Sequence, residues 1–177
     1  MANKEPLWLA LDQGGHASRA LVFNQQGHLV AQAYAAISTR RIGTDRIEHD
    51  ATEIADSLRI VIDEVAQTLG ADAACVQAAG LATQRSSVVC WNKHTGHPLS
   101  PVLSWQDRRN AELVNQLLPY KDEIQQLTGL VLSPHYGASK IRWCLDHLAE
   151  VQQAQQQGDL CCGPLASYLL FTLLEEH

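Results

Sequence analysis

Basic residues are scarce in this chain, and they gather nowhere along it. Lysine and arginine together number 13 against 19 acidic residues, which gives a formal net charge of −6. The nearest approach to a basic patch is formed by Arg40, Arg41 and Arg46. Because proteins bind the phosphates of nucleic acids through a concentrated basic face, we expect no nucleic acid partner.

Long apolar runs are also missing. No stretch approaches the roughly 20 consecutive apolar residues that are needed to cross a bilayer. The apolar run that follows the opening MANKEP is too short for the core of a signal peptide. We therefore expect a soluble, cytoplasmic protein with no membrane partner.

The cysteines lack the spacings of both disulfide frameworks and zinc sites. Their number, five, is odd, and no pair shows the CxxC spacing. Cys161 and Cys162 are direct neighbours, which seldom pair with each other. We expect reduced thiols and no zinc site.

Apolar residues, by contrast, are plentiful and patterned. They make up 46% of the 177 residues, enough for about one domain with a substantial core. Apolar runs at residues 7–11, 20–23 and 29–35 predict three strands, and the short polar connections between them favour an antiparallel meander. The polar segment that follows, rich in Arg and Thr, is interpreted as a loop.

Asp50 begins a predicted helix. Its carboxylate can cap the first amides while Glu53 reaches back, as in a capping box. Apolar residues then recur at helical spacing as far as Leu69, and Gly70 ends the helix. Two further strands are predicted at 76–82 and 87–91, and helices at 111–118, 121–127, 139–148, 152–157 and 164–174. This order predicts an α/β fold, with a mixed sheet flanked by helices.

The connection between the first two strands, in LALDQGGHASRALVF, carries the first candidate site. A strand that ends on Asp12 and turns tightly through Gly14 and Gly15 presents successive backbone amides, and such nests attract phosphate oxygens. Asp12 can then hold Mg²⁺, and Arg19 can neutralise phosphate charge. Taken alone, the same window also fits an ordinary turn.

Two more polar stretches carry candidate residues. In ATQRSSVVCWN, Gln84 and Arg85 stand at a strand end, where amide and guanidinium groups can bind ligand hydroxyls. The alternative is a surface arginine beside a turn. In VLSWQDRRN, Trp105 can stack on the apolar face of a sugar. The alternative there is a core tryptophan followed by a helix that Asp107 caps.

Taken together, five stretches resemble one family. They are LALDQGGHASRALVF, IEHDATEI, GLATQRSSVVCWNKHTGHPLSPVLSWQDRR, LTGLVLSPHYGASKIRWCLDH and GDLCCGPLASYLLF. In this order they resemble the N-terminal part of the FGGY carbohydrate kinases, the family of glycerol kinase and xylulokinase, from Leu7 to Phe171. The resemblance implies an actin-like (ribonuclease H-like) ATPase domain, ATP with Mg²⁺, and phosphoryl transfer to a hydroxyl of a sugar or polyol.

The resemblance also implies roles for individual residues. The nucleotide-binding residues are Asp12, Gly14, Gly15, His16, Ser18 and Arg19, with Asp12 as the metal-associated carboxylate. The substrate-binding residues are Gln84, Arg85, Ser86, Trp105 and His135. A KxxW signature of the family matches Lys140 and Trp143.

The chain departs from the family pattern at four of these positions. Gly15 and His16 replace two hydroxyl residues, which removes hydroxyl contacts to the γ-phosphate. Ser86 replaces a Glu of the glycerol kinases, and His135 replaces their Tyr. These last two changes favour a ketose such as a pentulose over glycerol.

Family members are much longer, and the resemblance places the general-base Asp beyond residue 177. We therefore expect residues 1–177 to be a partial N-terminal kinase domain without the second domain, and inactive by itself. The alternative is a non-catalytic actin-like module, a truncated pseudokinase that senses a sugar or contacts a protein. The sequence does not specify which sugar is used or whether the gene continues past residue 177. It is equally compatible with a monomer and with a homo-oligomer.

Overall fold

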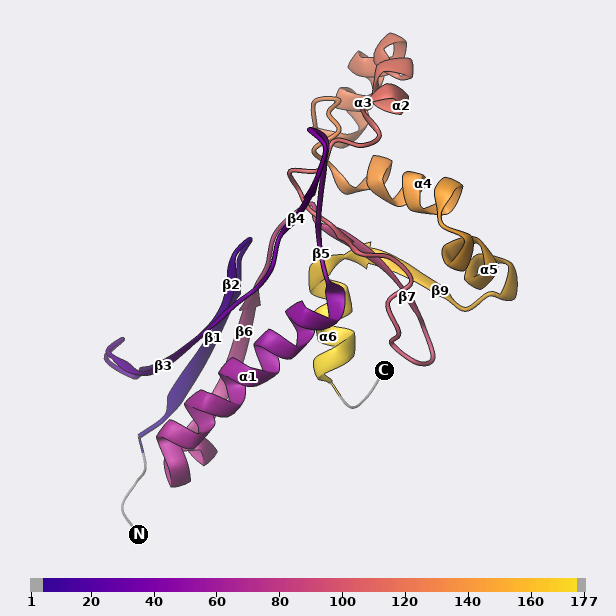
Figure 1. Ribbon diagram of the computed structural model, residues 1–177. Helices are drawn as coiled ribbons and strands as arrows, with labels where there is room; N and C mark the ends of the chain where they lie inside the picture. The colour runs from indigo at the N-terminus through magenta and orange to yellow at the C-terminus, as the bar shows by residue number, and fades with distance from the viewer. Residues whose placement is uncertain (1–4, 175–177) are drawn as a thin grey trace.

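Two β-sheets organise the chain (Figure 1). The computed structural model describes residues 5–174. The first sheet has the strand order β3-β2-β1-β6. Its members are β1 (Leu7–Gln13), β2 (Ala17–Asn24), β3 (Leu29–Ala36) and β6 (Val76–Ala82). The first three strands pair antiparallel in chain order, which confirms the predicted meander, and β6 runs parallel to β1.

Alternation along β2 explains why a helix covers one face of this sheet. Ala20 and Val22 are fully buried, whereas Arg19 between Ser18 and Ala20 is exposed on the other face. The helix α1 (Ala51–Leu69) lies along the buried face (Figure 1). It contributes apolar residues at helical spacing, namely Ile54, Leu58, Val61 and Val65.

The start of α1 follows one half of the predicted capping box. The Asp50 carboxylate accepts hydrogen bonds from the amides of Thr52, at 2.8 Å, and Glu53, at 3.0 Å. The other half of the prediction is wrong: the Glu53 carboxylate accepts from the amide of Ser38, at 2.9 Å. Glu53 therefore holds the end of the meander against the helix.

The second sheet has the order β4-β5-β8-β7-β9, and all its pairs are antiparallel. Its members are β4 (Arg40–Ile42), β5 (Arg46–His49), β7 (Val88–Asn92), β8 (Val102–Leu103) and β9 (Leu160–Pro164). The loop predicted before Asp50 is therefore wrong over β4 and β5. Both strands are short and charged, so their pairing, and not an apolar pattern, defines them.

The remaining elements are helical, and each predicted helix is present with no end shifted by more than three residues. They are η1 (Gly70–Cys75), α2 (Ala111–Gln116), η2 (Leu118–Tyr120), α3 (Lys121–Thr128), α4 (Gly137–His147), α5 (Ala149–Gln157) and α6 (Leu165–Leu173). None of the helices between residues 5 and 174 is long and apolar enough to cross a bilayer. All five cysteines carry free thiols.

Two apolar clusters hold the sheets and helices together. The larger joins the first sheet to α1 and α6, and includes Ala20, Leu58 and Leu169. The smaller packs α4 and α5 against β7 and β8, through Cys144 and Val151. In Figure 1, α2 and α3 lie at the end of the molecule away from the start of β1.

Candidate functional site

The β1–β2 hairpin places its charged residues on the face opposite α1. Asp12 pairs with Arg19 across the two strands, and their side chains lie 3.2 Å apart and half exposed. The next pair, Gln13 with Ser18, faces α1. The Ser18 hydroxyl is buried and shares a 2.7 Å hydrogen bond with that of Ser57. Asp12 and Arg19 are thus open to a ligand, whereas the Ser18 side chain points into the core.

The tip of this hairpin offers amides to an anion. Gly14 donates its amide to the carbonyl of Ala17, at 2.9 Å, which closes the turn. The carbonyls of Gly15 and His16 accept hydrogen bonds from Thr39 and Ile37. Within residues 5–174 the amides of Gly15 and His16 have no acceptor, and a Cβ built on Gly15 would meet nothing within 4 Å. Free donors beside open space fit a phosphate group.

The turn between β6 and β7 lies against this tip. Gln84 is only 7% exposed, and its amide nitrogen donates to the Gly14 carbonyl at 3.0 Å and to Gln13 Oε1 at 3.2 Å. Ser86 has a φ of 65°, the only positive φ among the described residues other than glycine. Such a backbone is uncommon for serine and marks a turn held by its surroundings. Arg85, between them, is exposed.

Trp105 and His135 form a second wall. The two rings lie edge to face with their centroids 5.6 Å apart. The Trp105 side chain is 40% exposed, so the alternative of a core tryptophan is wrong. Beside these rings lies a cavity of about 340 Å³. Its lining residues are Trp105, Gln106, Arg108, Ser133, Pro134 and His135.

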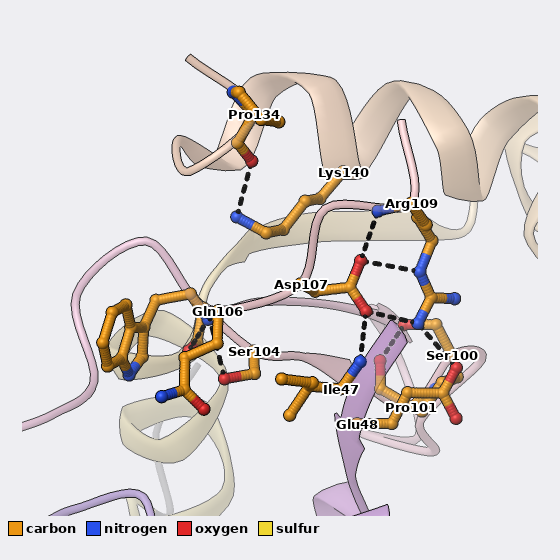
Figure 2. A network of polar contacts seen from close by, with 12 residues as sticks. Ile47, Glu48, Ser100, Pro101, Ser104, Gln106, Asp107, Arg109, Pro134 and Lys140 are labelled. Carbon is orange, nitrogen blue, oxygen red and sulfur yellow. Dashed lines mark hydrogen bonds and ion pairs between the residues drawn. The ribbon is translucent and has the colours of Figure 1, made fainter. Parts of the chain in front are cut away.

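A buried ionic network fixes the segment that carries Trp105 (Figure 2). The Arg109 guanidinium lies 2.7 Å from carboxylate oxygens of both Asp107 and Glu48, and its side chain is 1% exposed. Asp107 also accepts the amide of Ile47 at 2.7 Å, so it ties the segment to β5. Asn110, not Asp107, stands at the N-cap of α2, so the alternative of Asp107 as a helix cap is wrong.

Burial and hydrogen bonding act in opposite directions on Arg109. Burial by itself lowers the pKa of this guanidinium, but the hydrogen bonds to Asp107 and Glu48 outweigh it and raise the pKa. The guanidinium also lies 4.4 Å from the centroid of the Trp143 ring. Arg109 therefore stays charged, and its role is to hold this wall in place. The sequence interpretation did not assign this role to Arg109 or to Glu48.

Lys140 joins the turn at Ser86 to the wall at His135. Its side chain is almost fully buried in α4, and its ammonium donates to the carbonyls of Ser86 at 3.4 Å, Pro134 at 3.3 Å and His135. Figure 2 shows the ammonium pointing toward Pro134. Burial lowers the pKa of Lys140 to about 8; the charge of Asp107 opposes this shift and that of Arg109 adds to it.

The buried Lys140 makes the stability of the folded chain depend on pH in the alkaline range. Its folded pKa of about 8 lies below the ordinary value of 10.5 that applies to the unfolded chain. Between these values only the unfolded state binds the proton, so the free energy of unfolding rises with pH across this window. Urea titrations at about pH 8 and about pH 10 measure the rise. Lys140→Met should remove it and Lys121→Met, at an exposed lysine, should keep it; equal slopes in the two variants would contradict the assignment.

The sequence resembles that of one family of enzymes throughout its length. The family model described as "FGGY family of carbohydrate kinases, N-terminal domain" matches residues 7–177. Curated relatives include the glycerol kinases of Natranaerobius thermophilus, 35% identical over 96% of this chain, and of Shewanella frigidimarina, 36% identical over 94%. The chain spans about a third of these relatives, 34% of each.

Solved structures show the same fold. A glycerol kinase from Plasmodium falciparum, solved with ADP, superposes with a TM-score of 0.85 at 24% identity, covering 94% of this chain and 34% of that one. A gluconate kinase from Lactobacillus acidophilus gives 0.79 at 16% identity, with 94% and 33% covered. At these identities the likeness concerns the fold alone, and it confirms the predicted actin-like domain of FGGY kinases.

Proposed function

The chain belongs to the FGGY family of carbohydrate kinases, and from this membership we propose that it binds the phosphates of ATP and one side of a sugar or polyol for phosphoryl transfer. One contact carries the proposal. The hydrogen bond from Gln84 to the Gly14 carbonyl holds the anion-accepting hairpin beside the turn that bears Arg85. The two halves of the candidate site, 70 residues apart in sequence, are thereby neighbours in space.

The hairpin residues suit a nucleotide with Mg²⁺. The amides of Gly15 and His16 would donate to phosphate oxygens, and Arg19 would balance their charge. Asp12 supplies one carboxylate, and Mg²⁺ is commonly held by one or two carboxylates together with substrate phosphates. When bound, the ion neutralises charge that develops on the transferred phosphoryl group. The ADP in the Plasmodium falciparum glycerol kinase supports a nucleotide at this fold.

The second wall suits a polyhydroxylated substrate. Trp105 offers an aromatic face to the carbon side of a sugar, and the exposed guanidinium of Arg85 offers several donors to its hydroxyls. His135 adds a ring nitrogen at the same cavity. Gln84, whose amide bonds within the protein, would position these groups. We place the general base, which must lie within hydrogen-bond reach of the attacking hydroxyl, outside this chain.

The identity of the substrate is the finer part of the proposal. Ser86 and His135 depart from the glycerol kinase pattern, and this favours a pentulose. The second candidate is glycerol, because the curated relatives named above are glycerol kinases. A shorter side chain at Ser86 leaves more room beside Arg85, as a five-carbon ketose requires.

The test needs a protein that contains this chain and reaches the length of its relatives, called the extended protein below. It is supplied with ATP and Mg²⁺ and screened for ADP release with xylulose, glycerol and gluconate. We expect release that depends on the acceptor and is fastest with xylulose. Fastest release with glycerol would correct the substrate alone. Acceptor binding without ADP release would favour the non-catalytic module and overturn the kinase proposal.

A further inference from the structure

Ser87 links the two walls of the candidate site through its side chain. It is fully buried and lies directly before β7. Its hydroxyl donates to Gln84 Oε1 at 3.2 Å and accepts the backbone amide of Trp105 at 2.9 Å. Since Gln84 in turn donates to Gly14, three hydrogen bonds run without a break from the Trp105 wall to the tip of the hairpin.

Each of these three hydrogen bonds has a fixed donor and a fixed acceptor. The one hydroxyl proton of Ser87 goes to Gln84, which leaves its oxygen free to accept from Trp105. The Gln84 amide group accepts on its oxygen and donates from its nitrogen, so turning it over would set its oxygen against the Gly14 carbonyl and Gln13 Oε1, which are both acceptors. A buried donor or acceptor without a partner is costly. Loss of one of these bonds should therefore weaken the other two.

The backbone of Ser87 is anchored independently of its hydroxyl. Its amide donates to the Gln84 carbonyl at 3.3 Å, and its carbonyl accepts the amide of Leu165 at 2.9 Å. These contacts fix the residue to its own turn and to the start of α6. Removal of the hydroxyl alone should thus leave the turn folded while it disconnects Trp105 from the hairpin.

We propose that Ser87 is a positioning residue that sets the spacing between the phosphate hairpin and the Trp105 wall. This deepens the proposed function and rests on it: Ser87 touches neither substrate, but it aligns the acceptor hydroxyl with the phosphate. Such a residue affects the reaction rate through alignment, because a misplacement of about 1 Å at a reacting centre lowers the rate about 100-fold.

The spacing is tested first without any ligand, by amide NMR of this chain. Ser87→Ala should speed hydrogen exchange at the Trp105 amide by about tenfold, the fold-change for the loss of one typical hydrogen bond. It should also shift the amide resonances of Gly14 and Gly15. Ser87→Thr keeps the hydroxyl and should restore both signals. Ser87→Cys, similar in shape but a weak hydrogen-bonding group, serves if the alanine variant does not fold.

The matched control is Ser100→Ala, which removes another buried hydroxyl, bonded to the amide of Cys90 at 2.9 Å. It should leave the resonances of Gly14 and Gly15 in place. The proposal would be overturned if the Gly14 and Gly15 resonances did not change in Ser87→Ala. It would also be overturned if they shifted by the same amount in Ser100→Ala.

Catalysis gives a second readout, in the extended protein. Ser87→Ala should lower kcat by about 100-fold with little change in KM for ATP, and Ser87→Thr should recover it. A folded Ser87→Ala enzyme with the normal kcat would refute the positioning role. An extended protein without kinase activity would refute the proposed function instead, whereas the NMR result would still decide whether Ser87 sets the spacing.

Discussion

Replacing Asp12 by alanine is expected to slow phosphoryl transfer by the extended protein about 100- to 1,000-fold, the range seen when one preorganised charge-stabilising group is removed. Asp12 is the carboxylate at the mouth of the hairpin, half exposed and 3.2 Å from Arg19. Without it, Mg²⁺ would lose the protein ligand proposed above, and Arg19 would lose its partner. The rate of ADP release at saturating substrates is the measurement.

A second readout, on this chain alone, separates binding from catalysis. Titration with Mg²⁺ and ADP should shift the amide resonances of Gly15 and His16 in the natural chain and much less in Asp12→Ala. The matched control is Asp56→Ala, which breaks another exposed Asp–Arg pair, with Arg59 at 2.9 Å on α1. It should change neither readout. An Asp12→Ala enzyme as fast as this control would remove Asp12 from the site.

Replacing Asp107 by alanine should lower the free energy of unfolding by about 3–5 kcal/mol, the usual cost of removing one member of a buried ion pair. The change leaves the Arg109 guanidinium with Glu48 as its one carboxylate partner and the Ile47 amide without an acceptor. Water does not readily replace the Asp107 carboxylate at the Arg109 guanidinium or at the Ile47 amide. Urea denaturation followed by circular dichroism measures the loss.

An exposed pair provides the comparison for Asp107. Asp146 lies 2.8 Å from Arg142, one turn away on the surface of α4. Asp146→Ala should cost about 0.5 kcal/mol or less, because solvent screens exposed pairs. A loss in Asp107→Ala no larger than in Asp146→Ala would show that the network does not hold the Trp105 segment.

The first sheet and α1 follow from local sequence, whereas the second sheet does not. In β2 and α1 the apolar residues repeat with the period of the element, so both could be predicted. The strands β4 and β5 are only three and four residues long and consist mostly of charged and polar residues. The strand β9 ends in Gly163 and Pro164, two residue types that are depleted in strands. Since β9 pairs with β7, which lies far earlier in the chain, no local pattern reveals it.

The same distinction separates the predicted parts of the site from the missed ones. Asp12 and Arg85 became candidates because each stands in a polar stretch at a predicted strand end, and Trp105 because polar residues follow its ring. The contact of Arg109 with Glu48 spans 61 residues, and nothing near Glu48 points to it. Ser87 carries no charge or aromatic ring, so only its position between Gln84 and Trp105 discloses a role. Supporting residues of this kind can be recognised only from the three-dimensional structure.

The edge strand β6 has a consequence for work with the isolated chain. Its sequence, VQAAGLA, contains no charge and no proline, and most of its residues are exposed. One side of the strand pairs with β1, and the other lies at the sheet edge, where its amides and carbonyls can extend the ladder into a second molecule. Self-association in concentrated solution is therefore expected to begin at this strand, and a lysine placed at Ala79 should delay it.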